Sequence, residues 1–341
     1  MRVLITGAGL VGAHVAAELA AAAHVPLLFD ASPVPNYVAA VAGPLPVVRG
    51  DVVDPAAVTR ALREHGAQAV VHTAGLLGAK CARRPYLAFH VNAGGSAAVA
   101  EAARRCGVAR LVHISSLAVY DWDAVAPGAA VGEDFPTAPR TPYGVSKLAG
   151  ELAVRCYHRQ GWLTVTVLRM AGVYGPGHFR GGGRFGFQLQ RSLARALAGE
   201  PVAVPAELAG HEYLHAGDAA RAVRWVLEHD VSGIYNIGTG RLHDTTDVAT
   251  AIRCAVPGAS VTAAPAPPPV EVPLDLQRAR RDLPGWGCRD LTTGLSELAG
   301  TLRRHPWLVV LEEPGRRKES ADPGPQPVGA AVQAMSTKGE R

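Results

Sequence analysis

The chain has 341 residues, 48% of them hydrophobic and 18% charged, which is enough to bury the core of one large α/β domain or of a domain with a smaller partner. Its formal net charge of +5 comes from scattered arginines, and no basic stripe interleaved with aromatic residues predicts a nucleic-acid partner. The five dispersed cysteines contain no C-x-x-C pair, and there is neither a signal peptide nor an apolar run that could span a membrane. These features predict a soluble cytoplasmic protein with reduced thiols.

The first two-thirds of the chain alternate short apolar runs with alanine-rich helical patterns. Strands are predicted at Arg2–Thr6, Val25–Phe29, Pro46–Val48, Ala69–His72, Arg110–Ser115 and Thr164–Leu168. Helices are predicted at Leu10–Ala22, Pro55–His65, Ala97–Cys106 and Tyr143–Arg159. Continuous apolar strands that alternate with helices are typical of a parallel sheet buried on both faces. The pattern therefore predicts an α/β fold of the doubly wound Rossmann type, with a dinucleotide-binding and catalytic core at residues 1–172.

After Gly172 the alternation of strands and helices weakens. We predict a smaller, mainly helical substrate-binding region at residues 173–311, with some segments returning to the core. Its helices are predicted at Phe187–Ala198, Asp218–Glu228, Asp244–Val256 and Thr292–His305. The glycine-rich stretch Gly175–Gly186 predicts a mobile loop, Ala263–Pro269 a proline-rich connection, and residues 312–341 a disordered tail.

A glycine-rich turn follows the first predicted strand and opens the first helix. It has the pattern G-x-G-x-x-G, in which Gly7 allows the tight turn, Gly9 lets a pyrophosphate approach the backbone, and Gly12 lets the helix pack on the strand. The backbone N–H groups of Leu10 and Val11 open the helix and can face the phosphates. This turn predicts a dinucleotide site.

Asp30 ends the second predicted strand. A carboxylate at this position accepts hydrogen bonds from the adenosine ribose and repels a 2′-phosphate. No arginine or lysine lies between Asp30 and Arg49 to bind such a phosphate. The predicted cofactor is therefore NAD rather than NADP.

Tyr143 and Lys147 lie four residues apart, on one face of a predicted helix. Ser116 follows a strand and so lies at the carboxyl edge of the sheet, where open α/β folds bind their ligands. We predict that Tyr143 exchanges a proton with a secondary alcohol or ketone, and that Ser116 orients the substrate oxygen. Because a free tyrosine has a pKa near about 10, Lys147 and a positive nicotinamide ring are expected to lower that pKa.

These residues resemble the NAD-dependent epimerase/dehydratase family of extended short-chain dehydrogenases/reductases, over about residues 1–307. Further matches are Gly50-Asp51-Val52, His72-Thr73-Ala74-Gly75, Val91-Asn92, Leu168-Arg169, Val173-Tyr174-Gly175-Pro176-Gly177, Tyr235-Asn236-Ile237-Gly238 and Ala279-Arg280-Arg281-Asp282-Leu283. The resemblance implies that Asp51 and Val52 flank the adenine, that Ala74 lines the dinucleotide, that Asn92 orders the active-site helix, and that Lys147 binds the nicotinamide ribose beside Tyr143. It also implies a homodimer.

Several positions depart from the family pattern. The dehydratases that the chain resembles carry an Asp-Glu pair after the catalytic hydroxyl, and nucleotide-sugar decarboxylases carry a Glu at the position of Ala118, but this chain has Leu117 and Ala118. Gly172 stands where asparagine is common, and His211 stands where an arginine would bind a diphosphate. Arg180, Arg184 and Arg191 are candidate substitutes for that arginine or, alternatively, solvated surface charges. The predicted substrate contacts are Arg184, Arg191 and His211.

The segment from His211 to His215 also matches the zinc-protease pattern H-E-x-x-H. That pattern binds zinc when it lies on a helix, whereas here Gly217-Asp218 is typical of the cap of the next helix. We therefore predict no metal site. Measurement of bound zinc in the purified protein tests this prediction.

Three functions remain open from the sequence. The first is an NAD-dependent enzyme that oxidises a secondary alcohol of a sugar or nucleotide sugar by hydride transfer, as an epimerase working through a keto intermediate. The second is a simple NAD-dependent dehydrogenase or reductase of a smaller hydroxy or keto compound, which Gly172 and His211 favour. The third is a non-catalytic NAD-binding protein, which the intact set of Ser116, Tyr143 and Lys147 disfavours.

Overall fold

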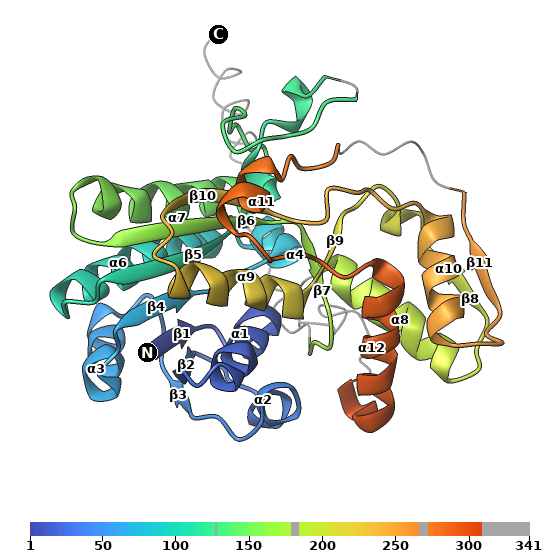
Figure 1. Ribbon diagram of the computed structural model, residues 1–341, viewed down its shortest axis with the longest axis horizontal. Coiled ribbons are helices and arrows are strands. Elements are labelled where there is room, and N and C mark those ends of the chain that lie inside the picture. Colours follow the sequence, from blue (N-terminus) through green and yellow to red (C-terminus); the bar gives the residue numbers. More distant parts are fainter. Residues whose placement is uncertain (127, 179–183, 266–271, 309–341) are drawn as a thin grey trace, which may run out of the picture. The chain divides into compact units, whose positions relative to one another are not determined.

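Seven parallel strands form the central sheet of the structure, a computed structural model in which residues 1–126, 128–178, 184–265 and 272–308 are described (Figure 1). The strand order is β10-β6-β5-β4-β1-β2-β3. The strands are β1 (Arg2–Thr6), β2 (Val25–Asp30), β3 (Val47–Arg49), β4 (Ala69–His72), β5 (Arg110–Ser116), β6 (Thr164–Met170) and β10 (Gly233–Ile237). The six predicted strands and the doubly wound α/β class are confirmed. The seventh strand comes from the C-terminal part of the chain.

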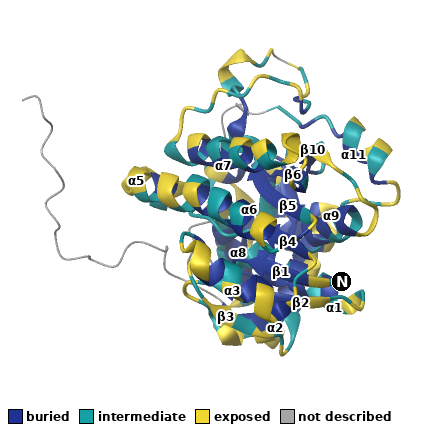
Figure 2. Ribbon diagram, turned by 90° about the vertical axis from the view of Figure 1, so that its left-hand side faces the viewer, coloured by how far each residue is buried: buried dark blue, intermediate teal, exposed yellow. Residues whose placement is uncertain are grey.

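Two layers of helices cover this sheet, and Figure 2 shows the buried strands between them. One layer contains α1 (Leu10–Ala21), α2 (Pro35–Ala42) and α9 (Ala216–Glu228), and the other contains α3 (Pro55–His65), α6 (Gly95–Arg105) and α7 (Pro142–Arg159). Successive residues of β1 point to opposite faces of the sheet. Val3 and Ile5 pack in the hydrophobic cluster that contains the first layer, and Leu4 packs in the cluster that contains the second. Fully apolar strands of this kind are buried on both faces, as the sequence predicted.

The C-terminal part of the chain contains short strands that the sequence pattern did not indicate. β7 (Gly172–Tyr174) pairs with β9 (Tyr213–His215), and β8 (Val202–Val204) pairs with β11 (Val261–Ala263). Its helices are α8 (Arg184–Leu197), α10 (Thr245–Ala255), α11 (Gln277–Asp282) and α12 (Leu291–Arg304). Strands of three residues are too short to show a periodic pattern, so the expectation of a mainly helical region missed them.

Shorter helices that were not predicted lie around the active-site edge and in connections. They are α4 (Gly78–Arg83), α5 (Pro85–Ala88), the π-helical turn η1 (Phe89–Gly94), and the 3-10 turns η2 (Leu117–Val119), η3 (Trp122–Ala124), η4 (Ala206–Leu208) and η5 (Pro306–Leu308). None of the helices in the described ranges is long and apolar enough to cross a membrane.

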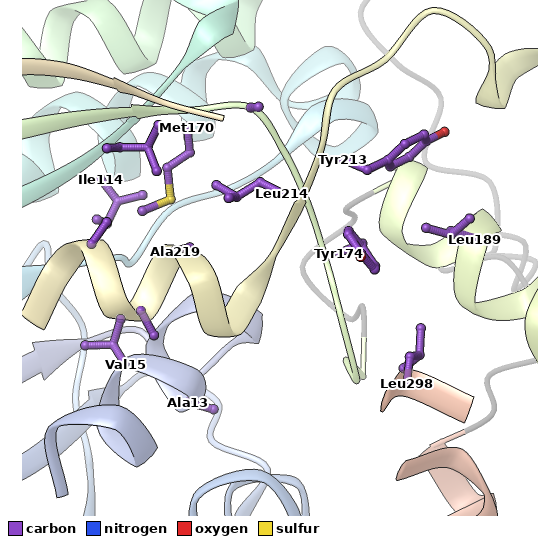
Figure 3. Packing of buried hydrophobic residues seen from close by; sticks show 14 of the residues in the cluster. Ala13, Val15, Ile114, Met170, Tyr174, Leu189, Tyr213, Leu214, Ala219 and Leu298 are labelled. Carbon is purple, nitrogen blue, oxygen red and sulfur yellow. The ribbon is translucent and has the colours of Figure 1, made fainter. Parts of the chain in front are cut away.

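One hydrophobic core joins the sheet to the C-terminal elements. Figure 3 shows Ile114 and Met170 of the sheet facing Ala219 of α9, while Leu214, Tyr174 and Tyr213 continue the cluster toward Leu189 and Leu298. Residues 1–311 accordingly form one compact unit. The two regions predicted on either side of Gly172, residues 1–172 and 173–311, both contribute residues to this core.

The predicted loop Gly175–Gly186 is only partly described. The Tyr37 hydroxyl donates to the Pro176 carbonyl oxygen over 3.1 Å, and the Gln190 amide bonds both the N–H and the carbonyl of Gly177 over 3.0 Å. Residues 175–178 are thus held between α2 and α8, and the end of the predicted loop belongs to α8. Residues 179–183, which include Arg180, and the predicted tail lie outside the described residues.

Candidate active site

The glycine-rich turn between β1 and α1 is shaped by close backbone contacts. Gly7 has a φ of +87°, and a Cβ atom there would lie 2.8 Å from the Ala74 nitrogen. A Cβ atom on Gly12 would lie 1.8 Å from the Gly7 carbonyl oxygen. Gly9, in contrast, has no other atom within 4 Å of its Cβ position, so its backbone is open to an approaching ligand. Since Gly9 begins α1 without a side-chain cap, the N–H groups of the first helical turn, including Leu10 and Val11, also point to this opening.

Alanine substitutions separate these roles. We expect Gly9→Ala to fold normally but to bind NAD at least about tenfold more weakly, because the added methyl group fills the space that a pyrophosphate needs. Gly12→Ala is expected to destabilise the fold as well, because its methyl group overlaps the Gly7 carbonyl. Thermal unfolding and titration with NAD measure the two effects. Equal NAD affinity in Gly9→Ala and the parent protein would contradict the proposed pyrophosphate site.

Asp30 lies at the carboxyl end of β2 beside this turn. Its carboxylate accepts the N–H groups of Ala8 and Ser32, each over 2.7 Å, which fixes its orientation. A carboxylate offers about four acceptor positions, so it can also bind ribose hydroxyls. Asp51 and Val52 follow β3, where Asp51 is exposed and Val52 packs against α6. Their predicted contact with the adenine stays a prediction.

The two hydroxyl groups predicted to be catalytic come from β5 and α7. Ser116 is the last residue of β5, and its hydroxyl, which accepts the Ala118 N–H over 3.2 Å, lies near enough to Tyr143 in the first turn of α7 to influence the pKa of that phenol. That turn begins at Thr141, whose side chain accepts the Gly144 N–H, and Pro142 supplies the first helical residue. Burial raises the pKa of Tyr143 to about 12, although the neighbouring Ser116 side chain lowers it. The protein alone therefore shifts this pKa away from neutrality, so a phenolate at neutral pH requires a further positive charge close to the ring.

Lys147 lies one turn further along α7 and is buried. Its ammonium group donates to the carbonyl oxygen of Ile114 in β5. Burial lowers the pKa of Lys147 to about 8, although the nearby Glu151 carboxylate raises it. The expectation that Lys147 and a positive nicotinamide ring together lower the pKa of Tyr143 stays a prediction.

The depressed pKa of Lys147 predicts a pH dependence. Lys147 carries its charge below about pH 8 and loses it as the pH rises through this value, so we expect kcat/KM to fall above about pH 8. In Lys147→Arg the guanidinium stays charged, and the remaining activity should no longer show this alkaline limb. A kcat/KM profile between about pH 6 and 10 tests both statements. An unchanged limb in the arginine variant would assign it to another group.

Asn92 connects this site to its surroundings. In the π-helical turn η1, its side chain bonds the N–H and the carbonyl of Leu76 over 2.7 and 3.1 Å and donates to Ser146 of α7 over 2.9 Å. The bond to Ser146 is the kind of contact by which Asn92 could order α7, the role that the family resemblance implies for it. Ala74 lies against the glycine turn, as its predicted place beside the dinucleotide requires.

Several residues of the site were missed by the sequence analysis. Cys81 is buried beside Asn92, with its sulfur 3.9 Å from the amide nitrogen, and no pattern indicated it. The fully buried Glu151 binds Arg169 of β6 through two hydrogen bonds of 2.7 and 3.1 Å. A charged residue inside an apolar strand was the available signal, because Arg169 requires a buried partner.

The predicted substrate residues lie in the C-terminal elements. The ring centroids of His211 and of Phe185 on α8 are 3.9 Å apart. The His211 Nε2 lies 3.1 Å from the Glu207 carbonyl oxygen. Arg191 is half-buried on α8, and the side chain of Arg184, at the start of that helix, is outside the described atoms. A Cβ atom on Gly172 would lie 2.9 Å from the Glu212 carbonyl oxygen, so a larger side chain there requires the backbone to move.

The H-E-x-x-H segment is extended rather than helical. Residues 213–215 form β9, and His215 caps α9. Residues four apart along an extended chain are about 13 Å apart, so His211 and His215 do not converge as on a helix. Glu212 is buried and accepts the N–H groups of Thr239, Gly240 and Leu274, which holds the loop after β10.

Comparison with known proteins agrees with this geometry. Residues 3–238 match the model of the NAD dependent epimerase/dehydratase family. The chain belongs to the NAD-dependent epimerase/dehydratase family. The family is NAD dependent, and NAD is the cofactor of this chain, for which the glycine turn and Asp30 are suited.

Two relatives of known activity match this chain over different lengths. The UDP-glucose 4-epimerase of Corynebacterium glutamicum is 31% identical over 306 residues, which cover 84% of this chain and 90% of that protein. The dTDP-glucose 4,6-dehydratase of Streptomyces niveus is 33% identical over 203 residues, which cover 57% of this chain and 55% of that protein. The chain thus matches only about half of the length of the dehydratase.

A solved structure extends the comparison. The UDP-glucose 4-epimerase of Thermus thermophilus in complex with NAD superposes with a TM-score of 0.73 at 30% identity, covering 89% of this chain and 99% of that chain. The family resemblance and the Rossmann fold inferred from the sequence are therefore confirmed.

Proposed function

We propose that the protein is an NAD-dependent epimerase that inverts a secondary alcohol of a sugar, carried as a nucleotide sugar. The observation that carries this proposal is the placing of Ser116 at the end of β5 and of Tyr143 and the buried Lys147 on α7, with Lys147 bonded to Ile114 of β5, at the same sheet edge as the glycine turn. The epimerase match over most of both chains supports it, whereas the dehydratase match is partial.

The residues act in turn on one substrate hydroxyl. NAD bound at the glycine turn and Asp30 would supply hydride-acceptor chemistry and the positive charge of its oxidised ring. Tyr143 removes the hydroxyl proton as the alcohol becomes a ketone, and Ser116 holds the same oxygen by a hydrogen bond. Lys147 binds the ribose and keeps positive charge near Tyr143. Tyr143 would return the proton to the same oxygen when the ketone, having turned in the site, is reduced on its other face.

Elimination of water is disfavoured by the residues that follow Ser116. Leu117 and Ala118 begin the turn η2 and carry no acid. The dehydratases that this chain resembles use an acid pair at these positions. The site therefore contains the groups for oxidation and reduction without those for loss of water.

A spectroscopic experiment tests the function. Purified protein is assayed for bound NAD and then mixed with UDP-glucose and other nucleotide sugars, while absorbance at about 340 nm and the sugar products are followed. An epimerase forms the epimer without net change in NADH. Stoichiometric reduction of added NAD would instead show a dehydrogenase.

The second candidate is a simple dehydrogenase or reductase of a smaller hydroxy or keto compound. The close approach of Gly172 to the Glu212 carbonyl favours it, because it leaves no room for the asparagine that is common at this position of the family. The place of His211 against Phe185 also favours it, since a histidine replaces a permanently charged arginine. Turnover of free hydroxy or keto acids with net NADH formation would select this candidate.

We further propose a cytoplasmic homodimer. The five free cysteines fit a reducing compartment. Tyr86, Phe89, Val145 and Leu152 are large apolar side chains exposed on α5, η1 and α7, which pack side by side (Figure 2), and a second copy would cover them. The charge variant Leu152→Glu should convert a dimer to a monomer in light scattering. A monomeric parent protein would contradict the dimer.

A further inference from the structure

A chain of buried hydrogen bonds runs from the end of β1 to the residue that carries the catalytic phenol. His72, at the end of β4, is 1% exposed. Its Nδ1 lies 2.7 Å from the Thr6 hydroxyl, and its Nε2 lies 3.1 Å from the Ser96 hydroxyl of α6. The Ser96 hydroxyl in turn lies 2.6 Å from the Asn92 carbonyl oxygen.

The direction of each hydrogen bond follows from the chemistry of the groups. A carbonyl oxygen only accepts, so the single Ser96 proton is donated to Asn92. Ser96 therefore accepts from His72, which must carry its proton on Nε2. The bare Nδ1 then accepts the proton of Thr6. Burial lowers the pKa of His72 to about 3, so this neutral form persists at neutral pH.

The series of hydrogen bonds continues to α7 through the side chain of Asn92. The Asn92 side chain donates to Ser146 over 2.9 Å, and the Ser146 hydroxyl donates to the Tyr143 carbonyl oxygen over 2.8 Å. The helices touch closely at this point, because a Cβ atom on Gly150 would lie 2.6 Å from the Asn92 carbonyl and 2.8 Å from the Ser96 hydroxyl. Because the helices lie this close, a small shift of the π-helical turn, whose polar contacts hold it, moves the facing turns of α7 as well.

We propose that His72 is a positioning residue for the reaction: through Ser96 and Asn92 it holds the π-helical turn that orients the first turn of α7, and with it Tyr143. The proposal rests on the proposed function of Tyr143. The side chain at this position must accept the hydroxyl proton of Thr6 on β1 and donate to the hydroxyl of Ser96 on α6. An imidazole with an acceptor nitrogen on one side and a donor on the other can do both. An apolar side chain would leave the hydroxyl groups of Thr6 and Ser96 without this partner.

The chain offers a matched control. His113 on β5 pairs with His72 on the neighbouring strand β4, and the centroids of the two rings are 5.4 Å apart. It is also fully buried, but neither of its ring nitrogens has a hydrogen-bond partner among the described residues. Replacing it by leucine removes an equally buried imidazole without cutting the hydrogen-bond chain.

The test compares His72→Leu, His72→Gln and His113→Leu as NAD-bound proteins. We expect His72→Leu to lower kcat about ten- to a hundredfold with KM and bound NAD within about twofold of the parent. His72→Gln, whose amide N–H can donate to Ser96, should recover most of this loss, and His113→Leu should stay within about twofold. Parent-like kcat in His72→Leu, or an equal loss in His113→Leu, would overturn the proposal.

Hydrogen exchange provides a readout that needs no substrate. Amides 144–147 in the first turn of α7 should exchange about tenfold faster in His72→Leu than in the parent or in His113→Leu. If the parent turns over no sugar substrate but this difference is present, the positioning role stands and the proposed function fails. If the parent is active and exchange is unchanged in His72→Leu, the positioning role fails and the function stands.

Discussion

Replacement of Tyr143 by phenylalanine is expected to lower kcat by about 10²- to 10⁴-fold while the protein still folds and binds NAD. In the proposed mechanism the phenol hydroxyl is the group that exchanges the substrate proton, and in the variant the aromatic ring that fills the site stays in place. The loss should appear in kcat rather than in NAD affinity, because Asp30 and the glycine turn are untouched. Steady-state kinetics and the content of bound NAD measure the two quantities.

Tyr157→Phe is the matched control, because Tyr157 lies on the same helix near its other end and is half-buried. This variant should keep kcat within about twofold of the parent. Full activity in Tyr143→Phe would remove the phenol from the mechanism. It would then favour the interpretation of the chain as a non-catalytic NAD-binding protein.

The largest effect on stability is expected from the buried ion pair beneath the catalytic helix. Glu151 is fully buried on α7, and Arg169 on β6 is 2% exposed. The Arg169 guanidinium also donates to the Glu133 carbonyl and lies over the Tyr120 ring, so it cannot turn to solvent. Glu151→Gln leaves this charge uncompensated, and we expect a loss of about 3–5 kcal/mol in the free energy of unfolding. Urea unfolding of the NAD-bound protein measures it.

Two further variants bracket this result. The double replacement Glu151→Leu with Arg169→Met removes both charges, so it should recover much of the lost stability. Arg155→Ala removes the more exposed partner of Glu151, which lies 3.3 Å away, and should cost no more than about 1 kcal/mol. A loss below about 1 kcal/mol in Glu151→Gln would show that the charge of Arg169 is compensated by other groups.

The sequence alone was sufficient for the features that depend on local pattern. Five of the six strands of the Rossmann half have four to seven residues and show as apolar runs, whereas β3 has only three and was predicted from its place between two helical patterns. Gly7, Gly9 and Gly12 have the spacing that a tight strand-to-helix turn requires. Asp30 was placed by its distance from that turn. The short strands β7 and β9 and the π-helical turn η1 were missed, because each is formed by contacts with distant segments rather than by its own periodicity.

What the sequence determined is therefore the family and its NAD cofactor, from a glycine turn with an acidic residue after the next strand, and it predicted the catalytic roles of Ser116, Tyr143 and Lys147 from their order along the chain. Only the tertiary structure decided how these groups are tuned and held. It places Tyr143 in surroundings that raise its pKa, and it brings together His72, Ser96 and Asn92 from separate elements. The physical reason is that burial and hydrogen bonding between distant residues arise from packing, which no local pattern records.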